Sequence, residues 1–200
     1  MTGEETVQGE NGEKTAPQVA VFCVGNKLWL DDGLGPAVYE EVMDRYIPAQ
    51  TVQLFDVGCM SMDMLPYVDS CDVIITVDAV DGTDSPAGTV FRYKPEDMKR
   101  PPQARSSLHD MRLGDLFMAA SLLGYEAQGV CLGMQVENMS PAEMVVGLTP
   151  KVYDALPLLV ETLAAELARL GVPFVDKETG QPVVGPKDEP GQPVVGPKDA

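Results

Sequence analysis

The sequence predicts one α/β domain: a twisted, mainly parallel five-stranded sheet with helices on both faces, doubly wound and flavodoxin-like, with one antiparallel edge strand. Two observations carry this prediction. Between residues 18 and 174, apolar runs alternate with segments of helical periodicity, which is the pattern of right-handed βαβ units. The runs are also apolar at nearly every position, as expected for strands covered on both faces.

Three strands and two helices are expected in the first half of the chain. The run QVAVFCVG at 18–25 ends in Gly and is typical of a buried parallel strand. A helix is predicted over 35–46, and TVQLFDV at 51–57 predicts the second strand. A short helix is expected over 61–67, before the third strand, DVIITVDAV, at 72–80.

The second half is expected to add two strands and a helix. GTVFRYK at 88–94 follows the third strand after a short turn; because no helical crossover fits there, an antiparallel strand is predicted. A helix capped by Ser106 or Ser107 is expected to run to about Leu123, and 126–136 holds the fifth strand.

A final amphipathic helix is predicted to start at Thr149 and Pro150, which suit the N-cap and first helical positions. Pro157 lies inside its apolar pattern and predicts a kink, or else a helix that starts nearer Asp154. The flanking residues, 1–17 and 175–200, are polar, charged or rich in Pro and Gly, and both are expected to be disordered tails. The second tail repeats GQPVVGPKD, and we interpret this repeat as a duplicated linker.

Composition excludes several classes of function. The formal charge is −17, from 31 acidic against 14 basic residues, which disfavours nucleic acid and anionic membranes as partners. The four cysteines form no CxxC pair, so a zinc ribbon or a redox motif is not indicated. The sequence has no 18-residue apolar run and no signal-peptide pattern, so a cytoplasmic protein is expected.

Ligands of doubly wound sheets bind beyond the carboxyl ends of the strands, where the strand order reverses. This predicts a site between the strands at 18–25 and 72–80. The loop GNKLWLDDGLGP after the first strand carries Asp31 and Asp32. Helix capping is the alternative role, but a cap needs one Asp and this loop has two. A nucleotide site is disfavoured, because the GxGxxG spacing is absent and paired carboxylates repel a pyrophosphate.

Asp78 ends the apolar part of the third strand, where a buried carboxylate needs a hydrogen bond, a paired charge or a metal. It could equally accept backbone N–H groups at the following turn. His109, the only histidine, lies near the start of a predicted helix, which favours the neutral, metal-binding imidazole. A lone histidine is more often an ordinary surface or packed residue. Two carboxylates and one imidazole suit nickel or zinc.

Five segments in this order resemble the nickel-iron hydrogenase maturation endopeptidases over nearly the whole ordered chain. They are GNKLWLDDGLGP, ITVDA, AGTVFRYKPED, HDMRLGDLFMA and GLTPKVYDALP. The resemblance implies that the family's metal-binding residues fall on Asp32, Asp78 and His109. Two segments depart from the family pattern. The family often has Asp-Gly-Gly followed by Thr or Ser after the second strand, where this chain has Asp56-Val57-Gly58-Cys59. The family's Gly-x-Gln-Pro motif is replaced here by Gly133-Met134-Gln135-Val136.

The resemblance further implies a protease that cuts a hydrogenase large-subunit precursor after nickel insertion. Nickel is then supplied by the substrate, zinc or cadmium could serve as surrogates, and Asp31 is a candidate proton carrier. We expect a monomer whose partner is the precursor, with no nucleic acid and no membrane. A nickel-dependent checkpoint or chaperone that does not cut is the alternative. A phosphate or nucleotide enzyme on the same fold is disfavoured by the acidic loop.

Overall fold

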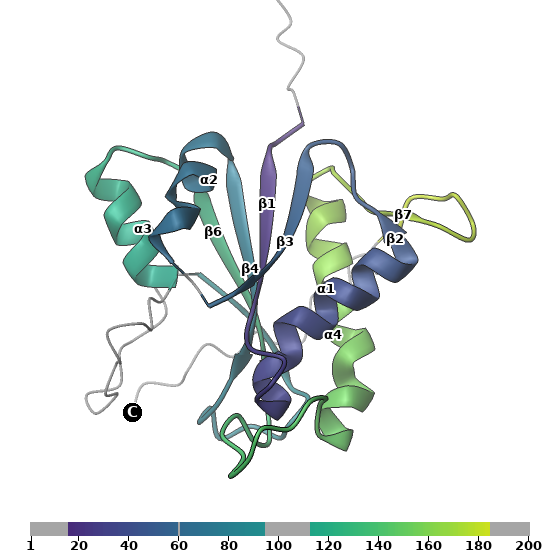
Figure 1. Cartoon of the computed structure of the whole chain (residues 1–200). Helices are drawn as coiled ribbons and strands as arrows, with labels where there is room; N and C mark the ends of the chain where they lie inside the picture. The colour runs from purple at the N-terminus through teal and green to yellow at the C-terminus, as the bar shows by residue number, and fades with distance from the viewer. Residues whose placement is uncertain (1–15, 60, 95–112, 185–200) are drawn as a thin grey trace, which may run out of the picture.

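The protein is built on a five-stranded sheet of order β3-β1-β4-β6-β5. The computed structural model describes residues 16–59, 61–94 and 113–184 (Figure 1). The strands are β1 (Val19–Val24), β3 (Val52–Gly58), β4 (Val73–Val80), β5 (Val90–Tyr93) and β6 (Gln128–Gln135). The pairs β1–β3, β1–β4 and β4–β6 are parallel and β5 is antiparallel to β6. The predicted fold class, including the antiparallel edge strand, is confirmed.

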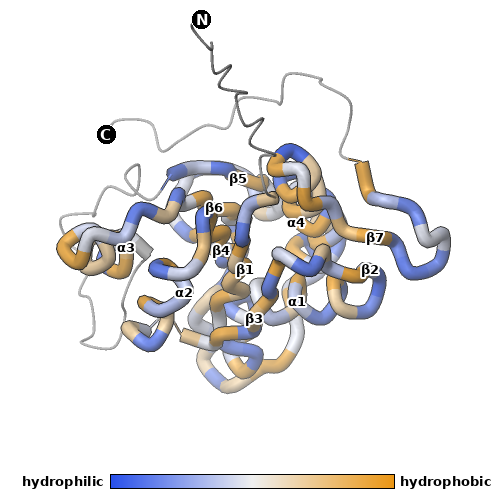
Figure 2. Tube along the Cα trace, turned by 90° about the horizontal axis from the view of Figure 1, so that it is seen from above, coloured by the Kyte–Doolittle hydropathy of each residue, from blue (hydrophilic) through white to orange (hydrophobic). Residues whose placement is uncertain are grey.

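Helices cover both faces of the sheet, as the view from above shows (Figure 2). The helices α1 (Leu34–Arg45) and α4 (Pro150–Arg169) pack together on one face, and α2 (Leu65–Ser70) and α3 (Leu113–Leu122) on the other. Successive β1 residues therefore point to different cores: Val21 joins the α1 and α4 side, and Phe22 the α2 and α3 side. This double burial explains why β1 is apolar at every position.

Two short 3-10 helices, η1 (Leu30–Gly33) and η2 (Met62–Met64), precede α1 and α2. The chain leaves β1 through α1 to reach β3 on one side, then returns through α2 to β4 on the other. The strand order therefore reverses between β1 and β4, as predicted. The backbone at this junction is packed so closely that two positions require glycine. A Cβ atom at Gly25 would lie 1.9 Å from the Asp32 carbonyl oxygen, and a Cβ atom at Gly35 would lie 2.1 Å from the Val24 carbonyl oxygen.

The last helix begins at Pro150 with Thr149 as its N-cap and continues through Pro157. The alternative start near Asp154 is therefore wrong. Pro157 lies on the exposed side of α4, where water can hydrogen-bond the carbonyl group that a proline leaves without an amide partner. The predicted start of the preceding helix, at Ser106 or Ser107, lies outside the described residues.

The domain extends past the predicted boundary at 174. Strand β7 (Val175–Asp176) pairs antiparallel with β2 (Tyr46–Ile47), and the Val183 N–H donates to the Phe174 carbonyl at 2.8 Å. The Asp176 carboxylate accepts from the N–H groups of Glu178 and Thr179, which closes the intervening turn. Composition predicts a disordered tail at 175–184 because it does not show that β2 offers these residues a pairing edge. Disorder of 185–200 and of 1–15 stays a prediction, since both lie outside the described residues.

Candidate functional site

Asp32 and Asp78 both lie at the point where the strand order reverses. Asp32 lies in η1, directly after β1, and Asp78 lies in β4, the neighbouring parallel strand. Both side chains are half-buried. The pKa of Asp78 is raised to about 7, chiefly by burial; the negative charge of Asp32 adds to the rise, and the Ala79 N–H opposes it. The fold thus brings two of the three predicted ligand residues within electrostatic reach of each other.

Asp78 accepts a backbone hydrogen bond, but its donor lies inside β4 and not in the following turn that the alternative role predicts. The Ala79 N–H donates to its carboxylate at 2.8 Å. This one hydrogen bond does not offset the burial, because the pKa of Asp78 stays well above its usual range. Asp78 therefore combines one backbone hydrogen bond within β4 with the electrostatics of a functional site, where shifted pKa values are common.

The Asp32 loop folds tightly on itself. The Asn26 N–H donates to both the carboxylate and the carbonyl oxygen of Asp32, at 3.1 and 3.0 Å, and the Asp32 N–H donates to the Trp29 carbonyl at 3.1 Å. Leu30 takes a positive φ of 50° inside this turn, a conformation that costs energy in a non-glycine residue. These contacts fix the position of the Asp32 carboxylate at the edge of the sheet.

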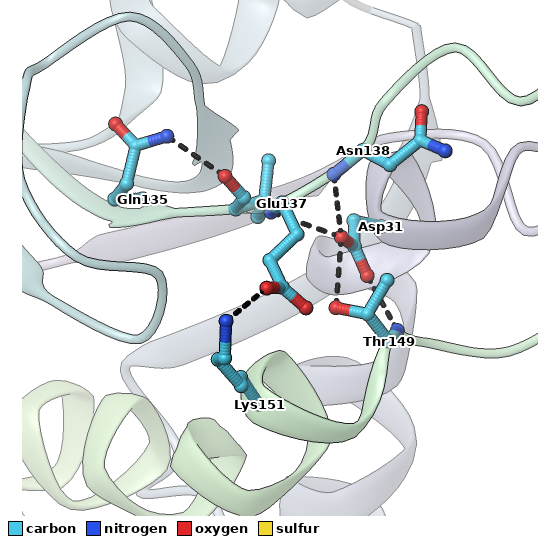
Figure 3. A network of polar contacts seen from close by, with 7 residues as sticks. Asp31, Gln135, Glu137, Asn138, Thr149 and Lys151 are labelled. Carbon is cyan, nitrogen blue, oxygen red and sulfur yellow. Dashed lines mark hydrogen bonds and ion pairs between the residues drawn. The ribbon is translucent and has the colours of Figure 1, made fainter.

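Figure 3 shows the polar contacts of Asp31, whose environment differs from that of Asp32. Its side chain is fully buried, and its carboxylate accepts four hydrogen bonds. The N–H groups of Glu137, Asn138 and Thr149 donate at 3.1, 2.9 and 2.6 Å, and the Thr149 hydroxyl at 3.0 Å. Such bonds offset the cost of burying a carboxylate. Proton transfer by Asp31 stays a prediction, but these contacts favour a positioning role that ties η1 to segment 137–149.

His109, the third predicted ligand, lies outside the described residues. Within residues 16–59, 61–94 and 113–184, no three His, Cys, Asp or Glu side chains are grouped closely enough to hold a metal ion. The metal assignment for Asp32, Asp78 and His109 therefore stays a prediction.

Two residues that support the site were not identified as such from the sequence. The sequence predicts only a helix cap at Thr149, yet this residue supplies two of the four donors to Asp31. Gln135, at the end of β6, accepts from the N–H and hydroxyl groups of Thr83 and donates to the Val136 carbonyl, so it holds the loop after β4. The sequence signal for the role of Gln135 is its position at the end of an apolar strand, because a polar side chain there needs hydrogen-bond partners.

A hollow of about 350 Å³ lies beside this edge, between the ends of β1 and β3. Its lining residues are Gly25, Asn26, Lys27, Pro36, Asp56, Gly58 and Cys59. The Lys27 ammonium contacts Asp56 at 3.1 Å and Glu40 at 2.7 Å, and hydrogen bonds to both raise its pKa. The segment 56–59, which departs from the family pattern, thus forms one wall of a hollow next to the Asp32 loop.

The fold and site define a doubly wound α/β protein with paired carboxylates at its switch point. Residues 36–166 match the sequence profile of the HycI family, described as hydrogenase maturation protease. The hydrogenase expression/formation protein HoxM of Azotobacter vinelandii is 32% identical over 165 residues, covering 78% of this chain and 79% of that protein. The hydrogenase 2 maturation protease of Escherichia coli is 26% identical, covering 80% and 97%.

Solved structures agree with the sequence matches. The hydrogenase maturating endopeptidase HybD from Escherichia coli superposes with a TM-score of 0.70 at 25% identity, covering 80% of this chain and 98% of that one. A maturation protease HycI from Thermococcus kodakarensis shares the fold with a TM-score of 0.60 at 18% identity, covering 78% and 95%. This chain belongs to the hydrogenase maturation protease family and is a peptidase. None of the helices in its described ranges has the length and apolar character needed to cross a membrane.

Proposed function

We propose that this chain is the endopeptidase that removes the C-terminal extension of a nickel-loaded hydrogenase large-subunit precursor, the final step of hydrogenase maturation. Family membership supports the reaction class. The observation that carries the location is the placement of Asp32, directly after β1, and Asp78, in the neighbouring parallel strand β4, at the switch point, where the charge of Asp32 adds to the raised pKa of Asp78. In this proposal the chain acts in the cytoplasm as a monomer. Its four cysteines are thiols, which fits a reducing compartment.

The nickel ion of the precursor is part of the substrate in this proposal. The residues fit such an ion chemically: Asp32 and Asp78 are half-buried carboxylates that repel each other, and a divalent cation between them would remove that repulsion. His109 would supply a nitrogen ligand of the kind that nickel accepts. When bound, a divalent cation supplies Lewis acidity at the scissile carbonyl or lowers the pKa of a water.

The chain's own residues then orient the substrate and move protons. A carboxyl group whose pKa is about 7, as in Asp78, can accept or release a proton at neutral pH. Asp32 is held by its loop, so its charge stays next to Asp78. Asp31 contributes by keeping this loop against segment 137–149, and a 1 Å displacement of a catalytic group can be costly.

The test uses the purified full-length chain with nickel-loaded and nickel-free precursor, followed by intact-mass analysis of the products. We expect the nickel-loaded precursor to give one shortened product and a released C-terminal peptide, and the nickel-free precursor to stay uncut. Full-length precursor that remains bound to the chain but uncut would support the non-cleaving checkpoint instead. Equal cleavage of both precursors would contradict the nickel requirement, and the mass of the released peptide would define the scissile bond.

A further inference from the structure

Five large apolar side chains lie exposed beside the candidate site. They belong to two loops, one after β1 and one before α4, and we call them the apolar ledge: Leu28, Trp29, Met144, Val145 and Val146. Their exposed fractions run from 39% for Trp29 to 74% for Val146. Single exposed apolar residues are common on protein surfaces, but several in one patch indicate a contact surface.

Backbone hydrogen bonds hold the two loops side by side. The Leu30 N–H donates to the Val145 carbonyl at 2.7 Å, and the Val145 N–H donates to the Leu28 carbonyl at 3.0 Å. Trp29 and Val145 thereby form a parallel β-bridge. The ledge is therefore one surface made of two chain segments, not a scatter of unrelated residues.

The ledge is also tied to the candidate site. The Asp32 N–H donates to the Trp29 carbonyl, so the loop turns directly from the ledge to the carboxylate. Asp31, between them, binds Glu137, Asn138 and Thr149, which flank the second loop on both sides. These bonds hold the apolar side chains in place at the surface, a preorganisation that lowers the entropy cost of binding.

The composition of the ledge fits the core of a protein interface. Its five residues carry no charge, although the whole chain has a formal charge of −17, and the charged residues Lys27 and Glu143 adjoin it in sequence. An uncharged centre with a charged rim is typical of protein–protein interfaces, and Trp and Met are enriched there. Nucleic acid and anionic lipid are disfavoured as occupants by the absence of basic residues in the ledge.

We infer that the apolar ledge docks an apolar segment of the hydrogenase large-subunit precursor next to the scissile bond. The inference rests on the proposed function. Trp29 is three residues from Asp32, and three residues of chain span at most about 11 Å. A polypeptide whose scissile bond reaches Asp32 and Asp78 therefore passes within a few residues of the ledge. The ledge sets affinity for the precursor and takes no part in the chemical step.

Trp29 is the only tryptophan of the chain, so full-length protein labelled with 5-fluorotryptophan gives one fluorine resonance. Adding nickel-loaded precursor is expected to shift or broaden that resonance. The test variant is Met144→Gln/Val146→Gln, and the matched control is Met118→Gln/Leu122→Gln, which alters two other largely exposed apolar residues, on α3. Circular dichroism and thermal unfolding check that both fold.

The ledge variant is expected to raise KM for the precursor about tenfold with kcat within twofold, the signature of lost uniform binding. The α3 control should leave both constants unchanged. An unchanged KM in the ledge variant, with an unmoved Trp29 resonance, overturns the inference while cleavage by the parent still supports the proposed function. If the parent binds precursor through the ledge but never cuts it, the proposed function fails and the docking surface stands.

Two further results would overturn the inference by assigning the ledge to another occupant. Sedimentation of the parent chain alone as a dimer, with the ledge variant a monomer, would make the ledge a contact between two copies. A shift of the Trp29 resonance when residues 185–200 are removed would place the chain's own tail on it.

Discussion

The carboxylate of Asp31 accepts hydrogen bonds from both the backbone N–H and the hydroxyl of Thr149, which lies 118 positions later in the chain. This contact joins the loop after β1 to the start of α4, and the next residue of that loop is Asp32. The two adjacent aspartates thus have different environments: Asp31 holds the loops together, and Asp32 lies within electrostatic reach of Asp78.

Asp31→Asn should destabilise the protein by about 2–4 kcal/mol, because an amide group would face N–H donors that now bind a buried carboxylate. Thr149→Ser is the matched control, since it keeps both the N–H and a hydroxyl and should change stability little. Urea unfolding followed by circular dichroism measures both. A change below about 0.5 kcal/mol for Asp31→Asn would show that the network is not structural.

Replacement of Asp32, Asp78 or His109 by Ala should abolish processing of the precursor in each case, while the protein stays folded. Asp32 and Asp78 are half-buried at the edge of the sheet, so their truncation leaves no large cavity. Intact-mass analysis after incubation measures processing, and circular dichroism measures folding. Asp63→Ala, at an exposed carboxylate in η2, is the control. Wild-type rates in all three variants would contradict the metal-site assignment.

Asp78→Asn should make the metal-free protein more stable at pH 8 than the parent, by on the order of 2 kcal/mol. The folded pKa of Asp78 is about 7, above its usual 3.8, so between these values the folded state holds more protons than the unfolded state. The contribution of Asp78 to stability therefore falls as pH rises from about 4 to 7 and is constant above that range. Thermal unfolding of both proteins from pH 4.5 to 8 checks this, and parallel profiles would contradict it.

Metal affinity should decrease as pH is lowered through about 7, because protons compete for the ligand atoms. The sequence alone suggests that the single histidine accounts for this slope, so that His109→Gln removes it. Since Asp78 also titrates near pH 7, we expect His109→Gln to bind more weakly but to keep part of the slope. Only the double variant His109→Gln/Asp78→Asn should have a metal affinity that does not change between about pH 5.5 and 7.5. Calorimetric titration with nickel or cadmium measures each curve; an unchanged affinity in His109→Gln would exclude it as a ligand.

Removal of residues 185–200 should leave folding and cleavage intact, because β7 and the Val183 contact with Phe174 remain. A chain that ends at Val175 loses the turn closed by Asp176 and the packing of Val183, so its stability should fall by about 1–3 kcal/mol. Denaturant unfolding and the cleavage assay compare the two. Loss of cleavage by the chain ending at Val184, with normal circular dichroism, would instead make the repeats a docking element.

Much of the fold follows from local sequence patterns. Residues such as Val21 and Phe22 are buried on opposite faces of β1, and this double burial makes the strand recognisable as a continuous apolar run. The short turn before 88–94 predicted the antiparallel strand that β5 forms. Residues 175–184 could not be predicted in the same way, because their order depends on the edge that β2 presents from far away in the chain.

The sequence by itself determined the α/β class, the switch point between β1 and β4, and the family, since hydrophobic periodicity and short motifs are local properties of the chain. Only the tertiary structure showed that Asp31 is a buried, hydrogen-bonded positioning residue while its neighbour Asp32 lies within electrostatic reach of Asp78. That distinction depends on which distant groups face each carboxylate: the N–H donors of segment 137–149 around Asp31, and the charge of Asp78 near Asp32. Hydrogen bonds and charge interactions across long sequence separations have no local sequence pattern, because folding alone brings the partners together.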